Sequence, residues 1–199
     1  MLNLPPSPVI GWSAGGRYAL AQGFAAPDLV TAIGVSAGRG PIDQVPGAID
    51  ALAPEDQLIL ALLAHDPARA LQAIATDDAW FADDGWESMF EGTWGAADDR
   101  VLATAGTMAA MKTHVREGAR QGAAGLISDD LVALTPWSFS ATDIQQPVHL
   151  WWGEDDTDTD RMGLDYLAGA IPHVTLVTYP REGHLLPIHH WREMLAAVS

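Results

Sequence analysis

Four short apolar segments along the chain have the character of buried β-strands. They are rich in β-branched and aromatic residues, and they lie at residues 9–11, 29–35, 148–152 and 174–179. Runs that are almost continuously apolar are typical of strands covered on both faces of a parallel sheet. The pattern therefore predicts a parallel sheet of about four strands.

Segments with apolar residues at helical spacing separate these strands. The interval between the second and third strands is the longest of them, and it contains an Asp66-Pro67 pair that is typical of a helix start. The helical segments expected along the chain are 17–22, 55–64, 68–75, 101–120 with an interruption at Gly106, 162–170 and 187–198. Strands that alternate with helices predict an α/β fold with right-handed crossovers.

The long helical interval is interpreted as an insertion into one core. The core is assigned to residues 1–37 and 137–199, and the insertion to residues 38–136. A chain of 199 residues is within the usual size of one domain, so no second independent domain is needed.

The composition is that of a folded, acidic protein. Hydrophobic residues make up 48% of the chain and charged residues 18%, which leaves enough apolar material for a packed core. The 26 acidic and 10 basic residues give a formal net charge of −16, and no segment gathers Lys and Arg into a patch. We therefore expect no nucleic acid and no anionic membrane among its partners.

The chain has no cysteine, which excludes disulfides, thiol nucleophiles and cysteine-ligated metal sites. The acidic run at 156–160 does not match a calcium loop, because Arg161 stands where such a loop requires glycine. We therefore expect no metal and no cofactor. The first residues lack a basic signal-peptide start and no apolar run is long enough to span a membrane, so a cytoplasmic location is expected.

Two pentapeptides match the G-x-S-x-G pattern of a nucleophile elbow, in which a sharp strand-to-helix turn exposes a serine. They are Gly11–Gly15 (GWSAG) and Gly34–Gly38 (GVSAG). Helix-forming residues follow the first, whereas Arg-Gly-Pro follows the second and does not begin a helix cleanly. Ser13 is therefore assigned as the nucleophile and Ser36 as a structural residue. The amide of Ala14 is the expected oxyanion donor, at a helix N-terminus.

A catalytic acid and a histidine are expected on loops after later strands, because such loops open on one edge of a parallel sheet. Asp156 follows the glycine turn after the third strand, and it is chosen over Asp155 and Asp158, which are interpreted as solvated. His184 follows the fourth strand, directly after Gly183. The other histidines are interpreted as structural or surface residues, among them His149, His189 and His190.

Three motifs in this order resemble the α/β-hydrolase fold family: GWSAGG at 11–16, WWGEDD at 151–156 and REGH at 181–184. The resemblance implies a Ser13–Asp156–His184 triad and a helical cap formed by the insertion. Family members place four further strands before the elbow, with the loop that usually donates the second oxyanion amide. Met1 is therefore interpreted as an internal methionine, a misassigned start or the beginning of a gene fragment.

The expected function is hydrolysis of a small carboxylic ester or related acyl compound through an acyl-enzyme. Trp12 and Trp137 are expected to contact this small-molecule substrate. A serine at the elbow argues against family members with an aspartate nucleophile, such as haloalkane dehalogenases and epoxide hydrolases. Lactone, amide, C–C bond and perhydrolysis chemistry remain open, because they use the same triad.

Two further classes of function remain open. One is a non-catalytic remnant that keeps the triad residues but does not turn over alone. The other is a binding module with an apolar pocket lined by Trp80, Trp86, Trp94 and Trp137. The sequence does not indicate the oligomeric state.

Overall fold

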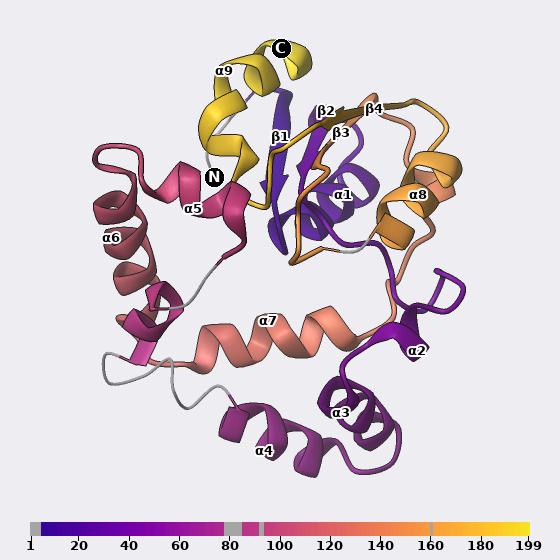
Figure 1. The fold of residues 1–199 in the computed structure, drawn as a ribbon. Coiled ribbons are helices and arrows are strands. Elements are labelled where there is room, and N and C mark those ends of the chain that lie inside the picture. The colour runs from indigo at the N-terminus through magenta and orange to yellow at the C-terminus, as the bar shows by residue number, and fades with distance from the viewer. Residues whose placement is uncertain (1–4, 78–84, 92–93, 160) are drawn as a thin grey trace. The chain divides into compact units, whose positions relative to one another are not determined.

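The computed structural model describes residues 5–77, 85–91, 94–159 and 161–199. The chain forms two compact units (Figure 1). The first unit contains Met1–Val45, Trp94–Val101 and Trp137–Ser199, and the second contains Pro46–Thr93 and Leu102–Pro136. This division keeps residues 38–45 and 94–101 with the core, whereas the boundaries drawn from the sequence assign all of 38–136 to the insertion.

A four-stranded parallel sheet forms the centre of the first unit, which confirms the predicted α/β fold. The strand order is that of the sequence: β1 (Ser7–Trp12), β2 (Val30–Ser36), β3 (Val148–Gly153) and β4 (Val174–Tyr179). Most side chains of β2 and β3 are buried, as expected for the central strands of a covered sheet. The last residues of the strands pair across the sheet, Trp12 with Ser36 and Gly153 with Tyr179. The loops that follow the strands therefore leave from one edge.

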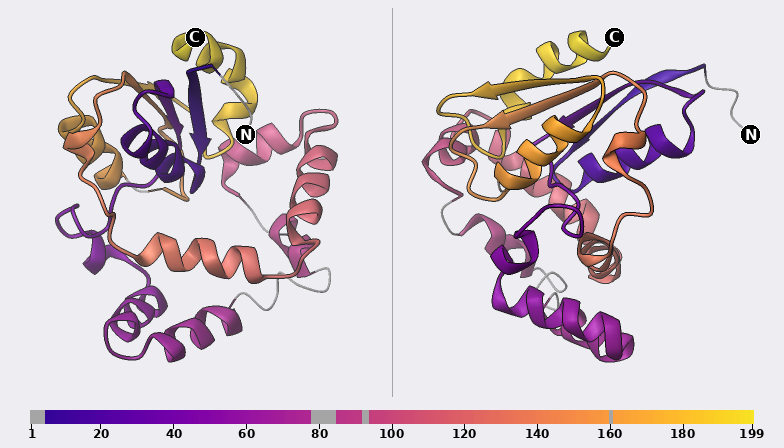
Figure 2. Two further views of the ribbon diagram at one scale, coloured as in Figure 1. Left: turned by 180° about the vertical axis from the view of Figure 1, so that it is seen from behind. Right: turned by 90° about the vertical axis from the view of Figure 1, so that its right-hand side faces the viewer.

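Helices cover both faces of this sheet. Figure 2 shows α1 (Gly15–Ala25) and α8 (Arg161–Ala170) on one face and α9 (Leu186–Val198) on the other. Two hydrophobic clusters match these layers: the cluster on the α1 and α8 face includes Leu20 and Leu167, and the cluster under α9 includes Trp151 and Met194. The first unit also contains the short helix η3 (Ala141–Asp143) and the start of α5 (Ala96–Leu102).

The second unit is helical. Its helices are α2 (Ala48–Ala51), α3 (Pro54–His65), α4 (Pro67–Asp77), η2 (Gly85–Phe90), α6 (Thr107–Ala119) and α7 (Ala124–Leu134). Helix α3 packs on α4, α4 on α7, and α6 on η2. The predicted interruption at Gly106 is confirmed, because this residue has a φ of 83° immediately before α6. The carboxylate of Asp66 accepts a hydrogen bond from the Arg69 amide at 3.2 Å, as the predicted start of α4 requires.

Helix α7 was not assigned from the sequence. Gly125 at its start and the Asp129-Asp130 pair in its middle weaken the helical pattern there. Within the described residues, every helix is too short or too polar to cross a membrane.

Candidate active site

Ser13 occupies a strained turn between β1 and α1. Its φ is 54°, in the left-handed region that residues other than glycine seldom adopt. The turn is held by hydrogen bonds from the Ser13 amide to the Ser36 carbonyl and from the Gly16 amide to the Ser13 carbonyl, both 2.9 Å. The backbone at Ser13 thus has the conformation expected of a nucleophile elbow.

Small residues around the turn are required by close backbone approach. A Cβ atom at Gly11 would overlap the carbonyl of Gly15, and one at Gly16 would lie 2.7 Å from Val35 Cγ1. Gly11 and Gly16 therefore allow strand and helix to meet at this turn, whereas a Cβ atom at Gly15 would point into open space.

The second pentapeptide has a different local structure. Ser36 is the last residue of β2 and has an exposed fraction of 0%, and the positive φ in this motif belongs to Ala37, at 49°. Ser13 is partly exposed. Of the two serines, only Ser13 combines the left-handed backbone with access to solvent.

Asp156 lies on the loop after β3, and its side chain is fully buried. One carboxylate oxygen, Oδ1, accepts hydrogen bonds from the amides of Asp158 (2.8 Å) and Thr159 (3.0 Å). The other, Oδ2, accepts from the Thr159 hydroxyl at 2.6 Å and lies 3.2 Å from His184 Nδ1. Burial alone raises the pKa of this carboxyl, but the hydrogen bonds from His184, Thr159 and Asp158 outweigh it, so the pKa of Asp156 is lowered.

His184 lies on the loop after β4 and is 5% exposed. Its imidazole is placed between two carboxylates: Asp156 on Nδ1 at 3.2 Å and Asp158 on Nε2 at 3.4 Å. The Asp158 side chain is 59% exposed, and Arg39 donates to the Asp158 carbonyl at 2.8 Å. The contact at Nδ1 is therefore buried, and further hydrogen bonds hold its carboxylate in place, whereas the contact at Nε2 involves an exposed side chain.

A direct contact joins the histidine loop to the elbow. The indole of Trp12, the residue before Ser13, donates a hydrogen bond to the His184 carbonyl at 2.9 Å. The rings of Trp12 and His184 also lie near each other, with centroids 5.6 Å apart. Three of the residues predicted from the sequence, Trp12, Asp156 and His184, are thus joined in one cluster beside the turn that carries Ser13.

The cluster includes a residue that the sequence analysis missed. Asp98, in the first turn of α5, accepts hydrogen bonds from the backbone amides of His184 (3.0 Å) and Leu185 (2.7 Å). Burial raises the pKa of Asp98, and these two hydrogen bonds offset the effect only in part. An acidic residue in the first turn of a helix is usually explained by the helix dipole, so the sequence offered no signal for this contact.

A comparison with known protein families identifies the family of the chain. The model described as "Alpha/beta hydrolase family" matches residues 3–198. This chain belongs to the alpha/beta hydrolase family. No curated protein sequence matched the chain.

Solved structures with the same fold are distant in sequence. MGS-M2, an alpha/beta hydrolase from a Medee basin deep-sea metagenome library, has a TM-score of 0.62 at 16% identity; the alignment covers 98% of this chain and 63% of MGS-M2. Est816, described as an N-acyl homoserine lactone degrading enzyme, has a TM-score of 0.56 at 18% identity, with 94% and 64% covered. The hydrolase BphD from Rhodococcus sp. strain RHA1 has a TM-score of 0.54 at 18% identity, with 96% and 61% covered. The chain therefore spans less than two thirds of the length of each.

Two other predicted site residues have different surroundings. Ala14 is the residue before helix α1, exposed, with its amide next to Ser13 in the chain. Trp137 packs against Phe139, with ring centroids 5.0 Å apart, and belongs to the hydrophobic cluster on the α1 and α8 face. Trp12 packs in the cluster on the opposite face of the sheet.

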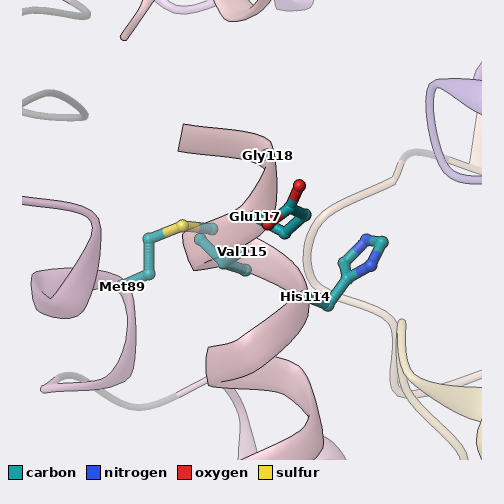
Figure 3. A pocket seen from close by; sticks show the side chains of 5 residues that line it. All are labelled: Met89, His114, Val115, Glu117 and Gly118. Atoms are coloured by element: carbon teal, nitrogen blue, oxygen red, sulfur yellow. The ribbon is translucent and has the colours of Figure 1, made fainter. Parts of the chain in front are cut away.

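The tryptophans of the insertion are divided between the two units. Trp86 is buried in the second unit, Trp94 is half-buried in the first, and Trp80 lies outside the described residues. A pocket of about 440 Å³ in the second unit is lined instead by Met89 of η2 and by residues of α6, where Met89 and Val115 point toward one another (Figure 3). Its lining residues are Met89, His114, Val115, Glu117 and Gly118.

No metal site is evident in the part of the chain that the structure describes. Within those residues, no three His, Cys, Asp or Glu side chains lie together so that they could hold an ion.

Proposed function

We propose that this hydrolase cleaves a small carboxylic ester or related acyl compound, with Ser13 as nucleophile, His184 as base and Asp156 as orienting acid. The observation that carries the proposal is the buried contact between Asp156 and His184 Nδ1, joined through Trp12 to the strained turn at Ser13. The same three kinds of group, on loops from different strands, form the triads of serine hydrolases.

In the proposed reaction, His184 Nε2 takes the proton of the Ser13 hydroxyl while the oxygen attacks the acyl carbon. The negative charge that forms on the carbonyl oxygen is stabilised by the amide of Ala14, at the N-terminus of α1. His184 then gives the proton to the leaving alcohol. Water, deprotonated by the same nitrogen, attacks the acyl-enzyme and breaks the bond between the acyl carbon and the Ser13 oxygen. His184 returns the proton to that oxygen, and the acid is released.

Asp156 has two roles in this scheme. Its Oδ2 accepts from Nδ1, which keeps the proton on that nitrogen and leaves Nε2 free to act as base. It also stabilises the imidazolium that forms during each proton transfer. For Nε2 to reach Ser13, the exposed Asp158 carboxylate has to leave its position 3.4 Å away.

The proposal is tested by hydrolysis of p-nitrophenyl acetate and butyrate by the wild type, Ser13→Ala and Ser36→Ala. We expect Ser13→Ala to lower the rate by about 10⁴-fold or more, whereas Ser36→Ala, in the buried second motif, keeps most of it. Mass spectrometry after treatment with a fluorophosphonate identifies the modified serine. Hydrolysis that is insensitive to Ser13→Ala would remove the triad from this protein's chemistry.

A second candidate is a chain that keeps these residues but does not turn over alone. It is favoured by the 61–64% coverage of the similar structures above and by β1, which pairs only with β2 in the described sheet. The discriminating measurement is the same ester assay on this chain and on one that includes in-frame sequence encoded upstream of Met1. Activity confined to the longer chain would support this candidate.

A further inference from the structure

Residues 94–101 form a strap that belongs to the core unit although the chain enters and leaves it through the second unit. Two contacts connect the strap to the histidine loop: the Asp98 carboxylate binds the His184 and Leu185 amides, and Arg100 donates to the Arg181 carbonyl at 2.7 Å. The strap also approaches the acid loop, since a Cβ atom at Gly95 would lie 3.5 Å from Thr157 Oγ1.

Asp98 is the central residue of these contacts. It is 1% exposed, and each of its oxygens binds a different amide, Oδ2 that of His184 and Oδ1 that of Leu185. Two bonds from one rigid carboxylate to consecutive amides fix the orientation of the peptide that carries the His184 side chain. The direction of the Cα–Cβ bond of His184 follows from that orientation.

The glycine before the histidine is explained by the same contact. A Cβ atom at Gly183 would lie 2.5 Å from both oxygens of Asp98, closer than van der Waals contact allows. Any larger residue there would push the carboxylate away from the two amides. The Gly183-His184 pair of the REGH motif is thus matched to a carboxylate 86 residues earlier in the chain.

We propose that Asp98 is a positioning residue, which holds the backbone at His184 so that Nδ1 of the imidazole stays in contact with Asp156 and Nε2 can serve Ser13 in the proposed reaction. This role rests on the proposed function, because it acts on the base of that reaction. Local capping of α9 does not require it: a neutral side chain could accept from one of these amides without burying a charge. A buried carboxylate that binds both amides fixes the geometry more tightly than a single hydrogen bond.

The test compares Asp98→Asn with the matched control Asp99→Asn in the next position of the same helix. The asparagine keeps one acceptor, but its amide group faces a backbone N–H and cannot bind it. We expect kcat for p-nitrophenyl acetate, per site titrated with a fluorophosphonate, to fall about 10–100-fold while KM changes less than about two-fold. Asp99→Asn should leave both within about two-fold of the wild type.

A second measurement does not depend on activity. Amide hydrogen exchange at His184 and Leu185 should become at least about ten-fold faster in Asp98→Asn and stay unchanged in Asp99→Asn. If Asp98→Asn does not fold, Gly183→Ala replaces it, since that change keeps the carboxylate but displaces it from the two amides.

The outcomes separate the two ideas. The positioning role is overturned if Asp98→Asn keeps a kcat per titrated site within two-fold of the wild type, even if less folded protein is obtained. It is also overturned if hydrogen exchange at the His184 and Leu185 amides is unchanged in this variant. An equal loss in Asp99→Asn overturns it as well. If Ser13→Ala leaves hydrolysis unchanged, the proposed function fails and the catalytic role of Asp98 with it, while the exchange rates still report whether the carboxylate holds the loop.

Discussion

Replacing Asp156 by asparagine removes a negative charge and turns one hydrogen-bond acceptor into a donor, while the shape of the side chain stays almost the same. Oδ1 of Asp156 faces two backbone amides, which can only donate, whereas Oδ2 faces the Thr159 hydroxyl and His184 Nδ1, which can each accept a hydrogen bond. The asparagine in Asp156→Asn should therefore keep its oxygen on the amides and place its NH₂ group on Thr159 and His184. Its NH₂ group would then donate to Nδ1 and force the imidazole proton onto Nε2.

This tautomer has no free nitrogen to accept the proton of Ser13. Serine triads that are changed in this way lose about 10⁴-fold in kcat, or roughly 5 kcal/mol at about 1.4 kcal/mol per factor of ten. The effect on folding should be smaller, because all four contacts keep a donor and an acceptor. Loss of the charge from these hydrogen bonds costs about 1–3 kcal/mol, which corresponds to a Tm lower by about 2–12 °C in a chain of this size. A loss of activity at 25 °C would therefore not result from unfolding.

The assay is p-nitrophenyl acetate hydrolysis together with thermal unfolding, with Asp155→Asn as the control. Asp155 is exposed and its backbone amide donates to the Glu182 carbonyl, so its side chain should be dispensable. An Asp156→Asn variant that keeps more than about a tenth of the wild-type kcat would show that the tautomer of His184 does not control the reaction. The acid assigned here would then be wrong.

Three further outcomes follow from the same geometry. Asp158→Asn should speed fluorophosphonate labelling about two- to five-fold, because the exposed contact with His184 Nε2 is worth roughly 0.2–1 kcal/mol; a ten-fold decrease would instead give Asp158 a part in the reaction. Gly11→Ala should lower the free energy of unfolding, measured with urea, by about 1–3 kcal/mol and should also lower activity, because the new Cβ atom would overlap the Gly15 carbonyl. If neither quantity changes, the close approach of strand and helix at Gly11 is contradicted. The pKa of Asp156 is lowered by folding, so this group stabilises the native state above about pH 4 and loses that contribution as the pH falls further. The stability difference between wild type and Asp156→Asn should therefore shrink as the pH falls below about 4, and a constant difference would refute the assignment.

The strands and the elbow could be predicted because their causes are local. The β-branched residues within Val174–Tyr179 favour a strand by themselves. The predicted bounds of this strand agree with those in the structure. The turn at Ser13 requires glycine at positions 11 and 16, so the GWSAGG motif records the constraint directly. Helices with an explicit start, such as α4 after Asp66, were also found, whereas α7, which carries Gly125 near its start, was not.

The contacts within the site join residues that lie far apart in the sequence, and no local sequence pattern indicates such a pairing. Asp156 and His184 were paired from the order of strands in a parallel sheet, and the structure places their side chains in contact. Their catalytic roles stay a prediction. Asp98 could not be found in this way, because its partner lies 86 residues away and its position in a first helical turn already has an ordinary explanation.

The location of Asp98 in the strap links the placement of His184 to the chain segments on either side of the strap. The strap is covalently continuous with helices of the second unit, since α5 ends at Leu102 and α6 begins at Thr107. If Asp98 positions His184, the placement of the base depends on a segment of the insertion rather than on its own loop alone. A change in the second unit that shifts the strap by about 1 Å would then lower kcat without touching the triad, as expected when geometry in the reacting complex is lost. Substitutions in α6 that lower kcat without changing the number of sites titrated with a fluorophosphonate would therefore be evidence that the insertion influences the placement of His184.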